Sequence, residues 1–395
     1  MTTSGRPLRI SIVQGAFLPV PPLLGGAVEK AWHALGLEFS RQGHIVTHVG
    51  RRFAGLPDEE RTGGVRYLRV PGYDAPASLL RLKLLDFLYS RRARKAIPEA
   101  DILVTNTFWL PLIERRRNRG RVYVHVARYP RGQLRYYPRA ALLQTVSRPV
   151  GEAIHREVGG RTPRIRVIPY PLSPAYLTAR PAPGSREILY AGRIHPEKGV
   201  HLAISAFARL VAGGTSGWTL RIVGPWETKH GGGGETYMAD LRRQAGGHPV
   251  TFAGPLFDER ELVACYGRAS VFVYPSLAEK GETFGLAVLE AMAAGCAPVV
   301  SMLPCFGDFV ARGSNGLSFD HRAPDAPAAL AAELELLVRD PSRLEALRSA
   351  AWSTARAFSL PLVAGRFLQD FLAIREGGRE DSPSLDAGAR PRMTA

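Results

Sequence analysis

The sequence predicts an α/β protein with two domains. Its 395 residues, 45% of them hydrophobic, exceed one typical domain and can bury a large core. Short runs rich in β-branched residues alternate with longer stretches of helical period, which is typical of layered parallel sheets. Five prolines between residues 169 and 184 interrupt this alternation, so we expect an interdomain linker at residues 171–186.

The first domain is expected at residues 1–170. Its first helix is predicted from Val28 to Arg41, because Trp32, Leu35 and Phe39 recur on one face. Its strands are predicted at residues 9–13, 45–49, 65–70, 102–105, 121–126, 143–146 and 166–168.

The second domain is expected at residues 187–358. Its strands are predicted at residues 188–191, 220–223, 250–252, 271–274 and 298–300. A last helix, within residues 359–375, is expected to cross back to the first domain, and residues 376–395 have the composition of a disordered tail. Two such sheets would enclose a cleft facing the carboxyl ends of their strands.

The composition bounds the compartment and the chemistry. Cys265, Cys296 and Cys305 lack the spacing of metal ligands, which predicts reduced thiols in a cytoplasmic protein and no metal site. Residues 1–7 lack the blocks of a signal peptide. The longest uncharged run, at residues 291–307, contains glycine and prolines, so we predict no membrane-spanning helix.

The positive charge is unevenly distributed. The net charge of the chain is +17. Residues 1–185 contain 30 Lys and Arg against 12 Asp and Glu, whereas the rest of the chain contains 22 Lys and Arg against 23 Asp and Glu. Residues 91–95 and 115–121 are the most basic runs. They indicate either a solvated arginine-rich surface or attraction to a membrane, a phosphorylated acceptor or nucleic acid. We find no aromatic and basic motif for nucleic-acid recognition.

Residues 79–95 mix seven leucine or phenylalanine side chains with basic ones. This pattern fits a helix lying on a membrane surface, and it fits a core helix with a basic exposed end equally well.

Two glutamates mark the most informative segment. Glu282 and Glu290 lie eight positions apart around a Phe284-Gly285 turn that opens an apolar helix. No other charge lies between them, which suggests a buried segment whose carboxylates need partners. Backbone amides or arginines could satisfy them, or a ligand rich in hydroxyl groups could.

The context of these glutamates resembles the retaining nucleotide-sugar glycosyltransferases of family 4. The Glu282 to Glu290 segment, with its flanks, is similar to the Glu-x7-Glu signature of that family. Other similar stretches are Tyr274-Pro275-Ser276, Pro298-Val299-Val300, Tyr190 to Val200, Ile222-Val223-Gly224 and Phe252-Ala253-Gly254. The resemblance implies the GT-B fold, in which two Rossmann-like parallel-sheet domains face each other across an interdomain cleft.

In the first half, residues 25–29 before a helix resemble the family's amino-terminal donor loop. His125 and Val146-Ser147 fall where the family has a strand-end histidine and a Val-Ser turn. The resemblance implies that His125 contacts the sugar near the anomeric carbon, whereas a lone histidine at a strand end is as often structural.

The resemblance also assigns roles in donor binding. Arg193 and Lys198 would stabilise the leaving diphosphate, whose charge grows as the glycosidic bond breaks. Glu282 would accept hydrogen bonds from sugar hydroxyls, and Glu290 would bind the ribose diol. The expected catalytic residues are Arg193, Lys198, Glu282 and His125. The expected donor-binding residues are Gly25, Gly26, Gly192, Arg193, Lys198, Gly224, Gly254, Glu282, Thr283, Phe284, Gly285, Leu286 and Glu290.

Geometry and chemistry are compatible with these roles. The amides of residues 284–286 open a helix, where free N–H groups favour anions and hydroxyl oxygens. At about 1.5 Å per residue, Gly285 and Glu290 are separated by about 7.5 Å along the helix. Arg193 and Lys198 could instead be surface charges at a helix start, and Gly25-Gly26 could be a plain turn.

Two segments depart from the family pattern. Residues 168–173, Ile-Pro-Tyr-Pro-Leu-Ser, replace the usual Ile-Pro-Asn-Pro-Val-Asp before the linker. Cys305-Phe306-Gly307-Asp308 stands where a Gly-Gly and a Glu usually follow the Pro-Val-Val strand. The second change leaves the identity of the donor sugar open.

We therefore predict a metal-independent retaining glycosyltransferase that needs no cofactor. A UDP-sugar is the first choice of donor and a GDP-sugar the second, and the acceptor is a glycan, a lipid-linked or envelope molecule, or alternatively a soluble small molecule. A nucleotide-sugar epimerase and a nucleic-acid-binding protein are the weaker alternatives. We expect a cytoplasmic location, with peripheral attachment to an anionic inner membrane left open.

Overall fold

The computed structural model describes residues 6–159, 164–179 and 184–377. Contacts divide the chain into two compact units. Unit 1 holds the residues up to Pro171 together with those from Leu360 onward, and unit 2 spans Leu172–Ser359. The tail predicted at residues 376–395 lies outside the described residues except for Glu376 and Gly377.

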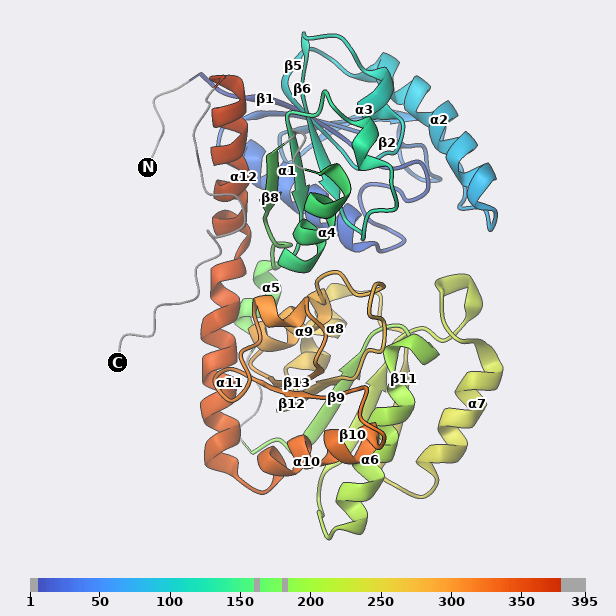
Figure 1. Ribbon diagram of the computed structural model, residues 1–395, viewed down its shortest axis with the longest axis vertical. Helices are drawn as coiled ribbons and strands as arrows, with labels where there is room; N and C mark the ends of the chain where they lie inside the picture. The colour runs from blue at the N-terminus through green and yellow to red at the C-terminus, as the bar shows by residue number, and fades with distance from the viewer. Residues whose placement is uncertain (1–5, 160–163, 180–183, 378–395) are drawn as a thin grey trace. The chain divides into compact units, whose positions relative to one another are not determined.

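Unit 1 is built on an eight-stranded sheet with the order β3-β4-β2-β1-β5-β6-β7-β8 (Figure 1). All neighbours are parallel except β3 and β4. The strands are β1 (Arg9–Val13), β2 (Ile45–Arg51), β3 (Glu59–Thr62), β4 (Val65–Val70), β5 (Ala100–Thr105), β6 (Arg119–Val126), β7 (Leu142–Thr145) and β8 (Arg164–Val167). The sequence did not predict β3, because this exposed edge strand is polar on both faces.

Helices cover both faces of this sheet. They are α1 (Ala27–Arg41), α2 (Leu79–Ala96), α3 (Leu110–Ile113), α4 (Arg148–Val158) and α12 (Leu360–Arg375), with a 3₁₀ turn at Leu134–Tyr136. Neighbouring residues of β5 illustrate the two layers, since Ile102 and Val104 pack in one core cluster and Leu103 in the other.

The last helix, α12, belongs to unit 1 although it follows unit 2 in the chain. It packs along α1 (Figure 1), with the ring centroids of Trp32 and Phe367 5.0 Å apart and those of Phe39 and Phe371 5.7 Å apart. Asp370 accepts a hydrogen bond from Tyr123 Oη at 3.1 Å. Burial of each aromatic ring contributes on the order of 2 kcal/mol, so α12 is an integral part of this core.

Unit 2 is built on a six-stranded parallel sheet with the order β11-β10-β9-β12-β13-β14. The strands are β9 (Glu187–Ala191), β10 (Thr219–Val223), β11 (Val250–Gly254), β12 (Val271–Tyr274), β13 (Ala297–Ser301) and β14 (Leu317–Phe319). Strand order reverses direction between β9 and β12, and ligands of such sheets bind outside the carboxyl ends of the strands at this switch point.

The helices of unit 2 complete its layers. They are α5 (Pro174–Thr178), α6 (Val200–Ala212), α7 (Gly234–Ala245), α8 (Glu259–Tyr266), α9 (Leu286–Ala293), α10 (Ala326–Val338) and α11 (Pro341–Ala355), with 3₁₀ turns at Pro196–Lys198, Thr228–His230, Phe306–Asp308 and Arg356–Phe358. Helix α5 lies within the residues predicted as a linker, of which residues 180–183 lie outside the described part. Pro174 starts α5, because a proline at the first helical position loses no hydrogen bond.

All three cysteines are buried and free of disulfides. Across the described parts of the chain, no helix combines the length and the apolar character that crossing a bilayer requires.

Candidate active site

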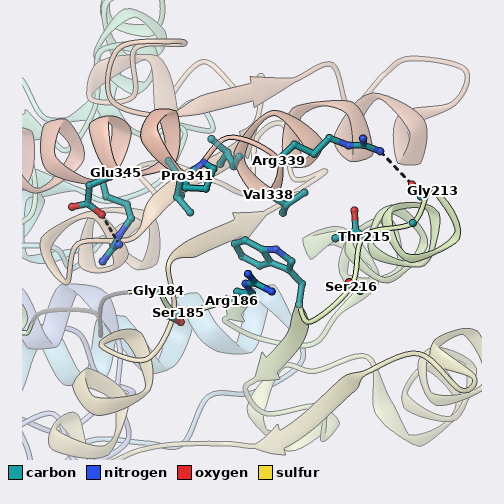
Figure 2. Close-up of a pocket in the computed structure, with 15 residues that line it drawn as sticks. Gly184, Ser185, Arg186, Gly213, Thr215, Ser216, Val338, Arg339, Pro341 and Glu345 are labelled. Atoms are coloured by element: carbon teal, nitrogen blue, oxygen red, sulfur yellow. Dashed lines mark hydrogen bonds and ion pairs between the residues drawn. The ribbon is translucent and has the colours of Figure 1, made fainter.

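A cavity of about 530 Å³ lies at the amino edge of the unit 2 sheet (Figure 2). It is lined by residues that precede β9 and β10, such as Arg186 and Trp218, and by the ends of α10 and α11. Its other arginines are neutralised locally: Arg348 pairs with Glu345 at 2.7 Å and Arg339 with Glu335 at 2.6 Å. None of the predicted site residues lines this cavity.

The predicted residues of unit 2 gather instead at the carboxyl edge. Gly192 follows β9 and Gly224 follows β10, and Gly192 N donates to Val223 O at 3.0 Å. A Cβ on Gly224 would lie 1.8 Å from Gly192 O. The two strand ends can therefore approach this closely only because position 224 is glycine.

A second close backbone contact, at Gly199, positions the side chain of Lys198. The 3₁₀ turn Pro196–Lys198 ends at Gly199, which has φ +67° and caps α6. A Cβ on Gly199 would lie 2.0 Å from Pro275 O. Glycine here lets the turn rest on the end of β12, across the switch point of the sheet, and this contact brings Lys198 to Glu282.

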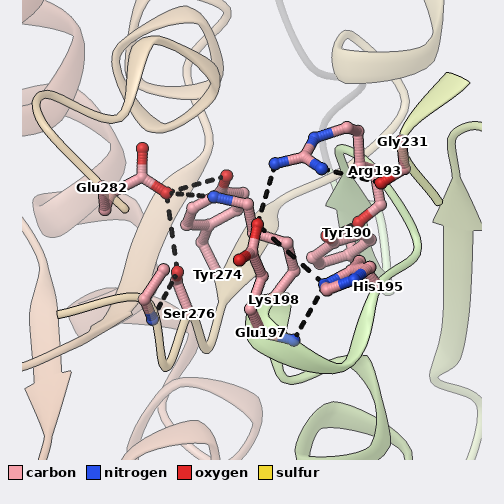
Figure 3. Close-up of polar contacts among 10 residues, drawn as sticks. Tyr190, Arg193, His195, Glu197, Lys198, Gly231, Tyr274, Ser276 and Glu282 are labelled. Atoms are coloured by element: carbon pink, nitrogen blue, oxygen red, sulfur yellow. Dashed lines mark hydrogen bonds and ion pairs between the residues drawn. The ribbon is translucent and has the colours of Figure 1, made fainter. Parts of the chain in front are cut away.

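Lys198 and Glu282 form a buried ion pair (Figure 3). The distance from Lys198 Nζ to Glu282 Oε2 is 2.7 Å, and the two side chains are only 7% and 11% exposed. Tyr274 Oη donates to the same carboxylate oxygen at 3.2 Å, and Ser276 Oγ lies 3.5 Å from it. The predicted catalytic cation and the predicted sugar-binding acid therefore share one locus.

Glu282 keeps one oxygen for another partner. Within the described residues, Lys198, Tyr274 and Ser276 all reach Oε2, and no hydrogen bond to Oε1 is found. Burial and the neighbouring Glu282 charge raise the pKa of Tyr274 well above its ordinary value. Tyr274 is therefore a neutral hydroxyl that can donate to the acid at any physiological pH.

Arg193 lies in the same block but has other hydrogen-bond partners (Figure 3). Its guanidinium donates to Gly231 O at 2.7 Å and to Glu197 Oε1 at 2.8 Å, and its side chain is 43% exposed. It therefore contacts neither Lys198 nor Glu282. Its charge is locally balanced, and its exposure leaves it free to change partners.

The helix α9 opens at Gly285, which has φ +86°. A Cβ there would lie 2.3 Å from a ring carbon of Phe306, so the departure from the family pattern at residues 305–308 puts an aromatic ring against the helix start. Phe284 is buried against Phe309, with ring centroids 5.2 Å apart. Of the predicted donor-binding residues, Phe284 can therefore contribute its backbone, since its side chain belongs to the core. Leu286 begins the helix, and Thr283 beside it is half-buried.

Glu290 lies one and a half turns into α9, beside two tyrosines that the sequence did not point to. Tyr266 Oη lies 3.4 Å from Glu290 Oε2 and 3.3 Å from Ala287 O. Burial, followed by the charge of Glu290, raises the pKa of both Tyr176 and Tyr266. Tyr176 comes from α5, and no motif marks it as a site residue.

In unit 1, His125 is 4% exposed near the end of β6. Its Nδ1 lies 2.6 Å from Gln144 Oε1, while Gln144 Nε2 donates to Thr145 O and Ile168 O, both at 2.7 Å. Gln144 thus has only its oxygen left for the ring, so His125 carries its proton on Nδ1. Nε2 accepts, and Tyr170 Oη lies 3.5 Å from it. Burial lowers the pKa of His125 to about 4, so the ring is neutral.

The predicted glycine positions of unit 1 have different surroundings. A Cβ on Gly26 would lie 2.2 Å from Glu29 Oε2, so this glycine makes room for a buried carboxylate that folds back over the start of α1. A Cβ on Gly25 would meet nothing within 4 Å, and the same holds for Gly254 in unit 2. Space at Gly25 and Gly254 is therefore open.

Among residues 6–159, 164–179 and 184–377, no three His, Cys, Asp or Glu side chains are grouped as a metal site requires. What the carboxyl edge of unit 2 offers is a cation, an acid with one unsatisfied oxygen, and a helix start. These groups can hold an anion beside a hydroxyl-bearing group.

Residues 179–353 match the family model of the Glycosyl transferases group 1. The glycogen synthase of Mycobacterium tuberculosis is 36% identical over 215 residues, which are 53% of this chain and 48% of that protein. The chain thus spans about half the length of the curated relatives it matches. These similarities agree with the resemblance to glycosyltransferases, whereas membership of family 4 and a retaining outcome stay predictions.

Two solved structures extend the likeness to nearly the whole chain. Sucrose-phosphate synthase from Thermosynechococcus elongatus has a TM-score of 0.73 at 19% identity and covers 94% of this chain and 100% of that chain. An Anabaena protein in complex with UDP and glucose has a TM-score of 0.67 at 17% identity and covers 93% and 100%. These likenesses, together with two parallel α/β sheets, confirm the predicted GT-B fold.

Proposed function

We propose that the chain is a retaining glycosyltransferase that takes a sugar from a nucleotide-diphosphate donor bound by unit 2. The observation that carries the proposal is the Lys198–Glu282 ion pair, which lies at the switch point of a parallel sheet and in the segment that opens α9. The match of residues 179–353 to a glycosyltransferase family supports it.

The chemistry follows from the charges. Breaking the sugar–phosphate bond builds negative charge on the diphosphate, which Lys198 and the amides at the start of α9 would stabilise more strongly in the transition state than in the bound donor. Lys198 has three N–H donors and uses one on Glu282, so it can bind a phosphate oxygen without leaving the acid. Arg193 would add a second cation by exchanging Glu197 for phosphate.

The two glutamates, Glu282 and Glu290, would bind opposite ends of the donor. Glu282 Oε1 would accept a hydrogen bond from a sugar hydroxyl, with Oε2 fixed by Lys198 and Tyr274. Glu290 would bind the ribose diol, beside the hydroxyls of Tyr176 and Tyr266. In unit 1, the neutral His125 ring would serve as a hydrogen-bonding group toward the sugar. We assign no protein nucleophile, cofactor or metal to the reaction.

A UDP-sugar is the favoured donor, in line with the Anabaena structure that holds UDP and glucose, and a GDP-sugar is the second choice. The acceptor is a glycan, a lipid-linked or an envelope molecule. A soluble small-molecule or natural-product acceptor is the alternative, in line with the similarity to a sucrose-phosphate synthase. For a lipid-linked acceptor, the exposed leucines of α2 would attach the protein peripherally to the inner membrane.

The test follows sugar release and transfer by NMR, with UDP-, GDP- and dTDP-sugars and with and without EDTA. We expect an α-configured donor to give an α-configured product at an unchanged rate in EDTA. Glu290→Ala should lose at least 100-fold in rate, and Glu290→Gln, which still binds one hydroxyl, should lose less. An inverted product, or sugar-nucleotide isomerisation in place of transfer, contradicts the proposal.

A further inference from the structure

We propose that unit 1 carries a second binding site, for phosphate groups, at the amino edge of its sheet. The site is a cavity of about 300 Å³, here called the basic pocket. It is lined by Arg91, Arg94, Lys95, Arg116 and Arg119. This inference does not depend on the proposed glycosyl transfer.

Two basic runs that are distant in sequence converge on the basic pocket. One run ends α2, and the other connects α3 to β6. Gly120, with φ +98°, fixes the approach, because a Cβ there would lie 2.7 Å from the backbone of Ile102 in β5. The backbone geometry of the sheet therefore brings the cations together. Arginines scattered at random over a surface would not depend on such a close backbone contact.

The charges of the basic pocket are not balanced by the protein. Glu114, whose side chain is 1% exposed, pairs with Arg119 at 3.2 Å and Arg94 at 3.4 Å. Its Oε1 accepts from the backbone amides of residues 115 and 116. Among the described residues, no carboxylate lies within ion-pair distance of the remaining three cations, which are Arg91, Lys95 and Arg116. Their mutual repulsion would be relieved by a bound anion.

The cavity of unit 2 at Arg186 and Trp218 provides the contrast. There, Arg339 and Arg348 each have a glutamate within 2.7 Å and a backbone carbonyl as a second partner. That cavity is also lined by arginines, and two of its three arginines are paired with a glutamate. In the basic pocket, by contrast, three of the five lining cations have no carboxylate partner among the described residues.

The ligand chemistry follows from the donors. Guanidinium groups match phosphate oxygens in bidentate geometry, and lysine adds a point charge. A volume of about 300 Å³ is roughly that of ten water molecules, enough for more than one phosphate group. Three of the five cations, Arg91, Lys95 and Arg116, are exposed, so the basic pocket is open to a ligand.

The basic pocket is separate from the candidate catalytic histidine of unit 1. Arg119 and His125 stand at opposite ends of β6, so they lie about 20 Å apart at about 3.3 Å per residue. A phosphate group could come from a soluble polyphosphate or from a lipid headgroup. Both sources share the chemistry named here.

The test uses the full chain and calorimetric titration with tripolyphosphate at low salt. The pocket variant, Arg91→Gln/Lys95→Gln/Arg116→Gln, removes three cations that have no carboxylate partner and leaves both ion pairs of Glu114 intact. The matched control, Arg61→Gln/Arg139→Gln/Arg156→Gln, removes the same charge from exposed sites elsewhere in unit 1. We expect the pocket variant to lose one binding equivalent, or at least tenfold in affinity, and the control to stay within twofold of the parent.

The proposed donor site of unit 2 is intact in both variants, so any tripolyphosphate it binds cancels in the comparison. Vesicles of phosphatidylglycerol and phosphatidylcholine form the second arm. Vesicle binding that is lost in the pocket variant identifies a headgroup, and tripolyphosphate binding alone identifies a soluble ligand; both support the basic pocket. Equal losses in the pocket and control variants, or no saturable binding in the parent, would overturn it.

Discussion

Lys198 and Glu282 depend on each other for stability as well as for the proposed chemistry. Each neutralises the other in a site where less than one eighth of either side chain is exposed. Removing one partner of such a pair leaves a buried charge uncompensated, whereas removing both leaves two neutral side chains. The double variant separates these two contributions.

We predict that Lys198→Met lowers the free energy of unfolding by about 3 kcal/mol. The double variant Lys198→Met/Glu282→Gln should recover most of this loss and remain inactive in sugar transfer, because the cation that we propose to bind the diphosphate is still missing. Urea unfolding and a transfer assay on the same samples measure the two effects. If the double variant were no more stable than the single one, the ion pair would not be the relevant interaction.

Buried histidines make unit 1 sensitive to acid. Burial lowers the pKa of His125 to about 4 and that of His48 to about 3, against about 6.5 in the unfolded chain. Protonation therefore favours unfolding, and each histidine removes stability as the pH falls below about 6.5 toward its folded pKa. The loss approaches about 1.4 kcal/mol per pH unit for each group.

We predict that thermal unfolding temperature falls between pH 7 and pH 5, and that His48→Gln reduces this dependence. His48→Gln keeps a hydrogen-bonding side chain opposite Gln14, which lies 3.0 Å from His48 Nε2. The check is a series of unfolding curves at fixed ionic strength. A pH dependence that is identical in the variant would assign the acid sensitivity to other groups.

At the residue scale, the sequence pointed to Lys198, Glu282 and Glu290 as candidate site residues but not to their neighbours. The family resemblance assigned Lys198 to the diphosphate and Glu282 to the sugar, and it gave no sign that the two side chains touch. That contact depends on Gly199 resting against Pro275, across two strands. Tyr176 was missed for a similar reason, because it reaches the site from α5 only through tertiary packing.

At the scale of elements, α9 is positioned by the absence of a side chain at Gly285. Gly285 and Gly254 have similar backbone angles, with φ +86° and φ +76°, so alanine costs a comparable backbone strain of about 1 kcal/mol at either position. Their surroundings differ, since a Cβ on Gly285 meets the ring of Phe306 and one on Gly254 meets open space.

We predict that Gly285→Ala is less stable than Gly254→Ala by about 1 to 3 kcal/mol, the cost of overpacking. Donor binding should also weaken, because the start of α9 must shift. Chemical denaturation compares the two variants directly. A second substitution, Phe306→Leu, should return part of the lost stability, and no recovery would argue against the steric explanation.

Helix α2 exposes an apolar surface at its amino-terminal end, where Arg81 and Lys83 also lie. Leu79, Leu80 and Leu84 are 67%, 81% and 57% exposed. The sequence left two interpretations of this helix open, a membrane-surface helix and a core helix with a basic end. Its middle is anchored in the core through Tyr89 and Ala93, so the exposed leucines form a separate feature.

We predict that Leu79→Gln/Leu80→Gln/Leu84→Gln abolishes co-sedimentation with anionic vesicles, because the apolar contacts with the bilayer are lost. The matched control is Leu362→Gln on α12, which removes one leucine that is 57% exposed. Stability should be unchanged in both variants. Retained vesicle binding in the triple variant would show that these leucines are not the membrane contact.

Elements were predicted well where apolar runs are long and buried. All twelve predicted strands exist, with ends shifted by at most two residues. The polar edge strand β3 was missed, and the three-residue β14 was too short to stand out. Helix α5 was hidden among prolines, although Pro174 in fact starts it.

At the scale of the whole molecule, charge and chemistry separate between the two halves. Excess positive charge lies in residues 1–185, whereas the candidate donor site lies in unit 2. This separation is consistent with two different anionic ligands: a diphosphate at the carboxyl edge of the unit 2 sheet and a phosphate-bearing ligand at the basic pocket of unit 1. Fold class follows from the strand and helix alternation, but the ligand identities require measurement.

The most direct test of the central claim is thermal stabilisation by a panel of UDP-, GDP- and dTDP-sugars. A donor at a hundredfold excess over its Kd should stabilise the folded protein by about 2.7 kcal/mol. We predict that at least one donor raises the unfolding temperature of the parent, that Lys198→Met loses this shift relative to its own baseline, and that Lys229→Met, on an exposed turn, keeps it. Stabilisation that persists in Lys198→Met, or no stabilisation by any nucleotide sugar, would contradict the account.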